Sequence, residues 1–176
     1  MPAQPLDIYR APVQADWIDD NGHMNVAYYV LMFDRATDAL LDRLGLGAAY
    51  RQRTNHSIYV LETHVTYDRE VKDGDMLRFT TQLVDADAKR LHFFHTMYHA
   101  TAGYRAATTE LLALHVDLAG PASLNFAATE QAAIDALLGE HRTLARPVQL
   151  GRVIGIRRTT PAGLSPLPHP SPPGEG

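Results

Sequence analysis

The sequence predicts an α+β protein in which one long hydrophobic helix packs against an antiparallel sheet. Three observations lead to this prediction. Apolar residues recur at helical spacing between Asn25 and Gly45, residues typical of strands alternate from Tyr59 to Leu118, and turn-forming residues separate these strands. The 176 residues fit one domain, and 45% of them are hydrophobic, which is enough for a substantial core.

The predicted helix follows a short strand, Ile8 to Gln14, and a polar loop, Ala15 to Met24, which contains Asp-Asp-Asn-Gly. Asn25 suits the start of the helix and Gly45 its end. Its apolar stripe consists of Val26, Tyr29, Val30, Phe33, Thr37, Leu40, Leu41 and Leu44. Further apolar residues widen this stripe, so we expect the sheet to wrap the helix closely.

Four long strands are predicted after a loop that contains Arg51 to His56. They are Tyr59–Tyr67, Met76–Val84, Arg90–Thr101 and Arg105–Leu118, joined by short turns into an antiparallel meander. In the first of them, strict alternation would place Tyr59, Leu61, Thr63, Val65 and Tyr67 on one face and Val60, Glu62, His64 and Thr66 on the other. A second helix is expected from Ala127 to His141, at the edge of the sheet.

We expect one folded domain over residues 1–150 and a Pro/Gly-rich tail over residues 151–176. A segment so rich in proline and glycine has little apolar surface to bury, which predicts disorder. The alternative is a proline-rich ligand for another protein.

Composition and charge argue against several classes of function. The formal net charge of −4 offers no general attraction for nucleic acid or for an anionic membrane, so neither is expected as a partner. The chain has no cysteine, which excludes disulfides, thiolate nucleophiles and cysteine-based zinc sites. With no recognisable signal sequence or membrane-spanning run, we expect a soluble cytoplasmic protein.

The run Trp17-Ile18-Asp19-Asp20-Asn21-Gly22-His23-Met24-Asn25, followed by Tyr28-Tyr29, carries a family resemblance. It resembles the signature of the 4-hydroxybenzoyl-CoA thioesterase-like hotdog superfamily, in which an Asp precedes a Gly by three residues and a helix with an early Tyr follows. The resemblance covers roughly Ile8 to Leu118. It implies the hotdog fold, a curved antiparallel sheet around a long central helix, and an acyl-CoA thioesterase that needs no cofactor and forms a homodimer or homotetramer.

A closer resemblance is to the betainyl-CoA thioesterase group associated with carnitine breakdown. It is carried by Glu62-Thr63-His64, Lys89-Arg90-Leu91-His92, Phe94-His95, Thr109-Glu110 and Leu114-His115-Val116-Asp117. This resemblance implies a short acyl group with a permanent positive charge.

The superfamily pattern places the catalytic carboxylate at Asp19, which would either attack the thioester or activate a water. Asp16 and Asp20 are the rival positions, and any Asp in such a loop could instead serve an Asx-turn or a helix cap. The thioester oxygen would then lie near the helix start, where the backbone N–H of Val26, and next that of Asn25, is the expected donor.

The remaining residues of the motif have open roles. His23 would polarise the substrate, orient Asp19 or order the loop. Asn25 suits a helix cap better than a chemical role. Gly22 supplies either a backbone conformation or a close approach to the substrate that a Cβ would forbid.

Aromatic residues offer a place for a cationic acyl group. The aromatic group consists of Trp17, Tyr28, Tyr29, Tyr59 and Tyr67, which are core residues by default. A trimethylammonium group is held by aromatic faces and a carboxylate, which Trp17 or Tyr59 with Glu62 would supply. No metal site is expected, because His92 should face away from His95 and His99, and four residues of strand separate the last two by about 13 Å.

Three other functions compete with a thioesterase. A hotdog dehydratase or hydratase would need a paired His and acid in its own motif, which we do not find. A non-catalytic acyl-CoA sensor of the transcription-regulator type would carry a helix-turn-helix, and few residues precede Ile8. A purely structural module would leave Asp19 without a chemical purpose.

Overall fold

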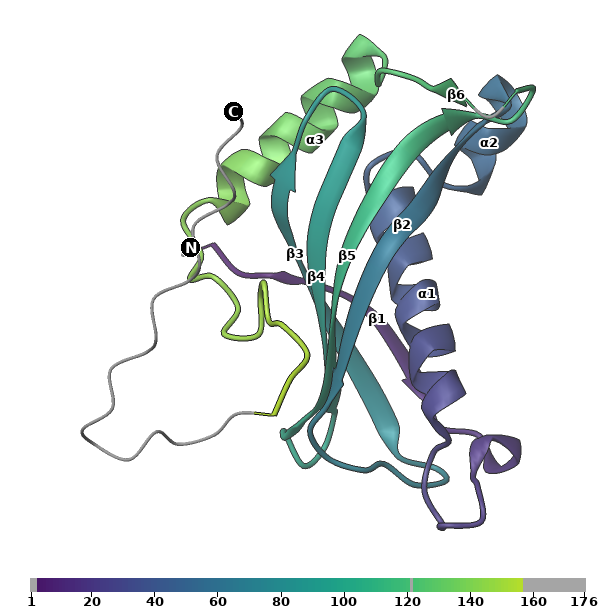
Figure 1. Ribbon diagram of the computed structural model, residues 1–176, viewed down its shortest axis with the longest axis vertical. Coiled ribbons are helices and arrows are strands. Elements are labelled where there is room, and N and C mark those ends of the chain that lie inside the picture. The colour runs from purple at the N-terminus through teal and green to yellow at the C-terminus, as the bar shows by residue number, and fades with distance from the viewer. Residues whose placement is uncertain (1–2, 121, 157–176) are drawn as a thin grey trace, which may run out of the picture.

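A long helix lies against one side of a curved antiparallel sheet in the computed structural model, which describes residues 3–120 and 122–156 (Figure 1). The elements, in chain order, are β1 (Leu6–Pro12), a 3-10 turn (Ala15–Trp17), α1 (Val26–Arg43), α2 (Ala48–Thr54), β2 (His56–Tyr67), β3 (Met76–Ala86), β4 (Arg90–His99), β5 (Arg105–Asp117), β6 (Ala122–Ser123) and α3 (Ala128–His141). Among these residues, no helix combines the length and apolarity needed to cross a membrane.

The long strands pair in the order β1-β3-β4-β5-β2, and every neighbouring pair is antiparallel. The short β6 pairs with β5. This arrangement confirms the α+β hotdog architecture, in which the sheet curves around α1. The predicted four-strand meander is only partly correct: β3, β4 and β5 are consecutive neighbours, but β2 pairs with β5 rather than with β3, so the segment after β2 crosses to the other side of the sheet instead of making a tight turn. The strand order also places β1 and β2 at the two edges of the sheet.

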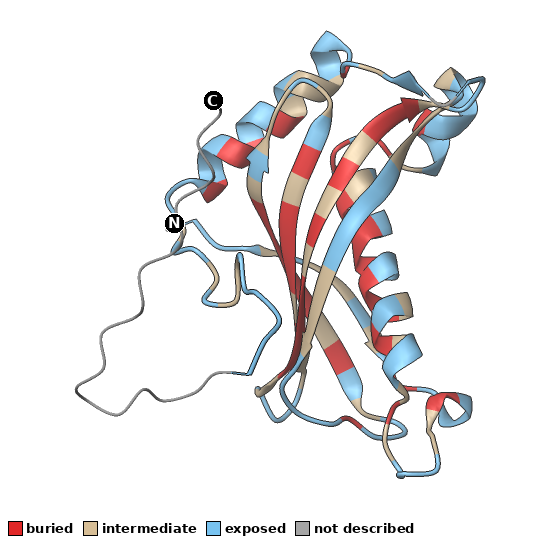
Figure 2. Ribbon diagram, in the orientation of Figure 1, coloured by how far each residue is buried: buried red, intermediate tan, exposed pale blue. Residues whose placement is uncertain are grey.

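One face of α1 forms the centre of the core. Its buried residues, which recur at intervals of three and four, are Tyr29, Met32, Phe33, Ala36, Thr37 and Leu40. Figure 2 shows this buried stripe along the helix, with exposed residues on the opposite side. Burying one large apolar side chain contributes about 1.5–3 kcal/mol, so this face fixes the helix on the sheet. Gly45, whose φ is 75°, follows the helix as predicted.

Residues 48–54 differ from the prediction, because they form the short helix α2 rather than a loop. Only Tyr50 of this helix is buried, so the sequence carries no apolar period to reveal it. The Tyr50 hydroxyl lies 2.8 Å from His115 Nε2 on β5, which anchors the helix by tertiary contact. Asn55, at φ 58°, ends the helix, and β2 therefore begins at His56, earlier than expected.

A β-bulge makes the predicted alternation of β2 wrong. The register shifts between Val60 and Glu62, so Tyr59 lies opposite Leu114 and Glu62 lies opposite Leu112. Because Leu112 and Leu114 are two residues apart on β5, Tyr59 and Glu62 share a face of the sheet. The extra residue of the bulge cannot be seen in a pattern of alternating side chains.

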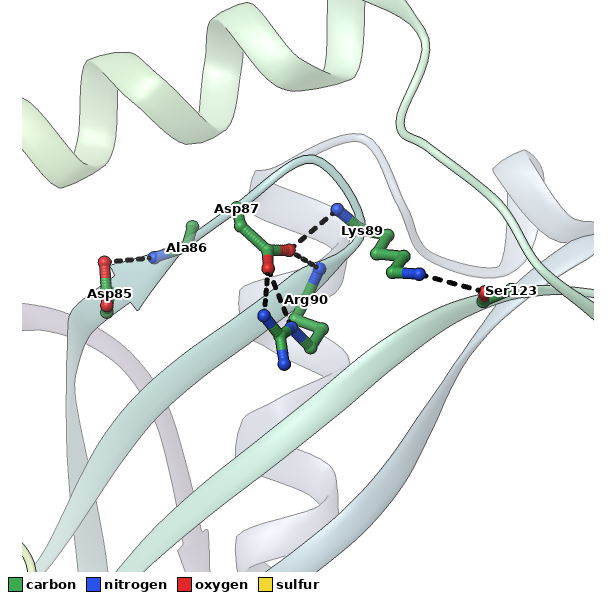
Figure 3. Close-up of polar contacts among 6 residues, drawn as sticks. All are labelled: Asp85, Ala86, Asp87, Lys89, Arg90 and Ser123. Carbon is green, nitrogen blue, oxygen red and sulfur yellow. Dashed lines mark hydrogen bonds and ion pairs between the residues drawn. The ribbon is translucent and has the colours of Figure 1, made fainter.

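The predicted turn between β3 and β4 is held by Asp87 (Figure 3). Its carboxylate accepts hydrogen bonds from the Arg90 side chain at 2.7 Å and from the backbone N–H groups of Lys89 and Arg90 at 3.0 and 2.7 Å. The bond from the Arg90 side chain and those from the backbone lower the pKa of Asp87 to about 2. Lys89 Nζ also reaches Ser123 Oγ at 3.3 Å, which ties the turn to β6.

A buried histidine joins α1 to the sheet. Thr37 Oγ1 donates to Phe33 O, so His95 Nε2–H donates to Thr37 Oγ1 at 3.1 Å, and His95 Nδ1 accepts from Thr81 Oγ1 at 2.7 Å. Complete burial lowers the pKa of His95 to about 3, and the ring is therefore neutral.

The other two histidines of β4 have different partners. His92 bonds Glu110 Oε1 at 2.8 Å on the opposite face of the sheet, as the strand geometry predicts, and His99 lies 3.3 Å from Asp75. In the described part of the chain, no three His, Asp or Glu side chains are grouped so that they could hold a metal ion.

We predict that His95 makes the fold sensitive to acid. Its pKa is about 3 in the folded state and about 6.5 in the unfolded state, so only the unfolded chain gains this proton between those values. The free energy of unfolding should be highest above pH 6.5 and should fall by up to about 1.4 kcal/mol per pH unit below it.

Urea unfolding at several pH values between 5 and 8 checks this prediction. Burial also lowers the pKa values of His115 and His141, so these two residues contribute to the pH dependence as well. The variant His95→Gln keeps both of them and removes only His95, which makes it the matched control. An equal pH dependence in wild type and His95→Gln would contradict the assignment.

Candidate active site

A cleft of about 330 Å³ lies between the start of α1 and the end of β2. It is lined by Asp19, His23, Met24, Asn25, Val26 and Tyr29 on the helix side and by Tyr67, Asp68, Arg69 and Glu70 on the strand side. The two walls are joined by a hydrogen bond from Met24 N to Val71 O, at 2.9 Å, and by an edge-to-face contact of the Tyr29 and Tyr67 rings. Burial raises the pKa of the Tyr29 hydroxyl, so it stays protonated at neutral pH.

The loop before α1 folds around Asp19. Its Oδ1 accepts a hydrogen bond from Asn21 N at 2.8 Å, and its backbone bonds those of Gly22 and His23. Gly22 has a φ of 79°, and the space where a Cβ would stand is open. The positive φ is a backbone conformation that favours glycine, which is one of its two predicted uses.

Asp19 lies in the cleft, whereas Asp16 and Asp20 are not among its lining residues. The Nδ1 atom of His23 is 4.0 Å from Asp19 Oδ1, and both side chains are partly exposed. His23 is thus close enough to orient this carboxylate electrostatically.

Val26, the first residue of α1, lines the cleft at the helix start. The side chain of Asn25 accepts from Ala27 N at 3.0 Å and its carbonyl from Tyr28 N at 3.0 Å, which makes Asn25 a helix cap, as expected. Within residues 3–120 and 122–156, the N–H of Val26 has no acceptor. It lies at the positive end of the helix dipole, where an oxyanion is stabilised.

Sequence reasoning missed the strand wall of the cleft. Asp68, Arg69 and Glu70 directly follow β2, and only the sheet order brings them opposite Asp19. The signal available in the sequence was a run of three charged residues at the end of a predicted strand. That pattern is equally typical of an exposed turn.

Of the five grouped aromatic residues, Tyr29 and Tyr67 line this cleft, whereas Trp17, Tyr28 and Tyr59 do not. Trp17 is only 7% exposed and stacks on Tyr28, with ring centroids 5.3 Å apart. At the exposed edge of β2, Tyr59 lines a groove of about 490 Å³ beside α1. Glu62 lines a different cavity, of about 410 Å³, near His92 and Glu110, so the two residues do not share a pocket although the register puts them on one face of the strand. Within one protomer, Tyr59 and Glu62 are therefore separate from Asp19.

Comparison with known proteins places this geometry in a family. A model of the thioesterase-like superfamily matches residues 13–147, which include the whole cleft. The chain belongs to the thioesterase-like superfamily. Its curated relatives include a betainyl-CoA thioesterase of Pseudomonas aeruginosa, which is 42% identical over 88% of this chain and 97% of the relative.

Further relatives of this thioesterase-like protein are longer. An L-carnitine dehydrogenase/betainyl-CoA thioesterase of Rhizobium meliloti is 37% identical over 88% of this chain, which corresponds to 31% of that relative.

Among solved structures, a hypothetical protein of Staphylococcus aureus in complex with CoA superposes with a TM-score of 0.82 at 29% identity, over 89% of this chain and 98% of that one. A putative thioesterase of Pseudomonas putida superposes with a TM-score of 0.76 at 37% identity, over 90% of this chain and 99% of that one.

Proposed function

We propose that this thioesterase-like protein hydrolyses betainyl-CoA to betaine and CoA, with Asp19 as the catalytic carboxylate. The observation that carries the proposal is a cleft lined by both Asp19 and Val26, whose backbone N–H has no acceptor among the described residues. The 42% identical relative, matched over nearly its whole length, supports the substrate.

The reaction needs an ionised carboxylate beside the thioester carbon. Asp19 either attacks this carbon and expels the CoA thiolate, forming a mixed anhydride that water then cleaves, or removes a proton from the water that attacks. In both routes negative charge develops on the carbonyl oxygen. The Val26 N–H would bind that oxygen, and one such donor typically stabilises the transition state by about 2.7–4 kcal/mol.

We further infer that two copies complete the site. On its outer side β2 has no strand partner among the described residues, and its Tyr59, Val60 and Leu61 are 43–56% exposed. Exposed edges of this kind invite pairing with another strand. If two β2 edges pair about a twofold axis, the start of each strand lies beside the end of the other. With the axis near Leu61, a second copy's Tyr59 would lie opposite Thr63 or His64, on the part of β2 that leads to the Asp19 cleft.

Replacing Asp19 by Asn should lower kcat by roughly 10² to 10⁴-fold, because the amide cannot act as a base or a nucleophile. The assay follows release of free CoA thiol from betainyl-CoA, with circular dichroism to verify the fold. Asp16→Asn and Asp20→Asn are the matched controls and should retain activity. Near wild-type turnover by Asp19→Asn would disprove this mechanism.

The protein should sediment as a dimer or larger assembly at micromolar concentration. Leu61 lies near the middle of β2, so Leu61→Lys would bring two like charges together at a twofold axis and should produce a monomer with little activity. Val148, which is 94% exposed and outside the sheet, provides the control variant Val148→Lys. A fully active wild-type monomer would rule out the shared site.

Betainyl-CoA should be preferred over its neutral isostere 3,3-dimethylbutyryl-CoA. One cation–π contact is worth about 0.5–2 kcal/mol, which corresponds to about two- to thirtyfold in kcat/KM. Tyr59→Leu and Glu62→Gln should reduce this ratio without abolishing hydrolysis of the neutral ester. Trp17→Leu removes a core side chain as well, so its thermal stability must be compared first. Equal kcat/KM values for the two esters in wild type would refute the cationic pocket.

A further inference from the structure

Arg69 is the one Lys or Arg among the described residues that line the Asp19 cleft. Arg105 Nε binds Asp68 at 2.6 Å, and Lys72 Nζ lies 3.6 Å from Glu70. The two carboxylates that flank Arg69 are therefore each paired with another cation. Across residues 3–120 and 122–156, no carboxylate lies within 4.0 Å of the Arg69 guanidinium. Arg69 thus offers the cleft a positive charge with which no carboxylate of the described residues pairs.

Tyr104 holds this guanidinium in place. Arg69 Cζ lies 3.9 Å from the centroid of the Tyr104 ring, and the Tyr104 hydroxyl donates to Glu70 O at 3.0 Å. The backbone N–H of Arg69 bonds Ala106 O at 3.1 Å, which fixes the other end of the residue. A guanidinium over an aromatic face keeps its N–H groups, which lie in its plane, available for a bidentate contact.

We propose that Arg69 binds a phosphate group of the CoA part of the substrate. This inference rests on the proposed thioesterase function and adds a binding residue to the same cleft. Arg69 lies on the exposed strand side of the cleft, whereas Asp19 and Val26 line its helix side, so a CoA arm that leaves the cleft past residues 67–70 would meet an oriented cation. Arginine is well suited to phosphate because its planar fork matches two phosphate oxygens.

The charge of Arg69 also sets the direction of the substrate. A betainyl group is a permanent cation, and Arg69 would repel it. The phosphates of CoA are the anionic end of the same molecule. The acyl group therefore points away from Arg69, toward the edge of β2 and the second copy, while the CoA arm leaves along Tyr67–Glu70.

The test compares Arg69→Gln with wild type on betainyl-CoA, betainyl-dephospho-CoA and betainyl-pantetheine. Charge-assisted hydrogen bonds at a partly exposed site predict a loss of about tenfold in kcat/KM for the CoA ester, expressed in KM with kcat unchanged. The pantetheine ester has no phosphate and should be hydrolysed equally by both proteins. On the CoA ester, the kcat/KM of Arg69→Lys should lie between the values of wild type and Arg69→Gln.

The dephospho-CoA ester identifies the phosphate. A loss on betainyl-CoA alone assigns the contact to the 3′-phosphate, whereas a loss on both nucleotide esters assigns it to the diphosphate. Arg53→Gln is the matched control, because Arg53 also lies over a tyrosine ring, Tyr50, at 5.5 Å, but pairs with Glu130 and does not line the cleft.

Calorimetric titration with CoA itself separates this inference from the proposed reaction. Wild type should bind CoA about tenfold more tightly than Arg69→Gln does, whatever its turnover. An equal loss on the pantetheine ester, unchanged kinetics in Arg69→Gln, or CoA binding that does not depend on Arg69 would each overturn the inference. Hydrolysis of none of the three esters by wild type, together with CoA binding that depends on Arg69, would overturn the proposed function alone.

Discussion

The packing of one face of α1 into the curved sheet is the constraint on which the rest of the structure depends. Tyr29, Met32 and Phe33 are buried toward one end of the helix and Leu40 toward the other, so the helix can neither rotate nor slide without exposing large apolar side chains. His95 adds two hydrogen bonds at the same interface, one at each ring nitrogen, with Thr37 on α1 and Thr81 on β3. This fixed axis determines where the first turn of the helix lies.

The position of that first turn creates the chemistry of the cleft. Every helix start leaves backbone N–H groups without intrahelical partners. Asn25 satisfies those of Ala27 and Tyr28, which leaves Val26 N–H to the cleft. The loop before the helix is held to it by Asn25 N, which donates to Trp17 O at 2.9 Å. The proposed catalytic carboxylate and the proposed oxyanion donor are thus placed by the same short segment.

The edge strand β2 takes part in both the cleft and the proposed dimer interface. Its end forms one wall of the Asp19 cleft, and its outer edge has no partner among the described residues. The bulge after Val60 puts Tyr59 and Glu62 on one face of this edge strand. If a second copy pairs here, residues that are remote from Asp19 within a protomer become part of its surroundings. The proposed cation site and the proposed dimer therefore depend on the same strand.

The sequence by itself determined the elements whose signals are local. The apolar period between Asn25 and Gly45, the turn residues of the meander and the Asp19 motif all act over a few residues, and the helix, four strands and the loop of the site followed from them. The proposed tail was also a local inference, and its residues 157–176 lie outside those described. Gly151, within that proposed tail, donates a hydrogen bond to Glu110 on β5.

Only the tertiary structure decided which of these parts meet. The α2 helix depends on Tyr50 reaching His115, and the bulge of β2 depends on its register with β5, so neither leaves a pattern in its own segment. Arg69 and Asp19 are fifty residues apart in the chain and share a cleft because β2 ends beside the start of α1. Contacts of this kind are set by the packing of distant segments, whereas a sequence pattern reports the preferences of neighbouring residues.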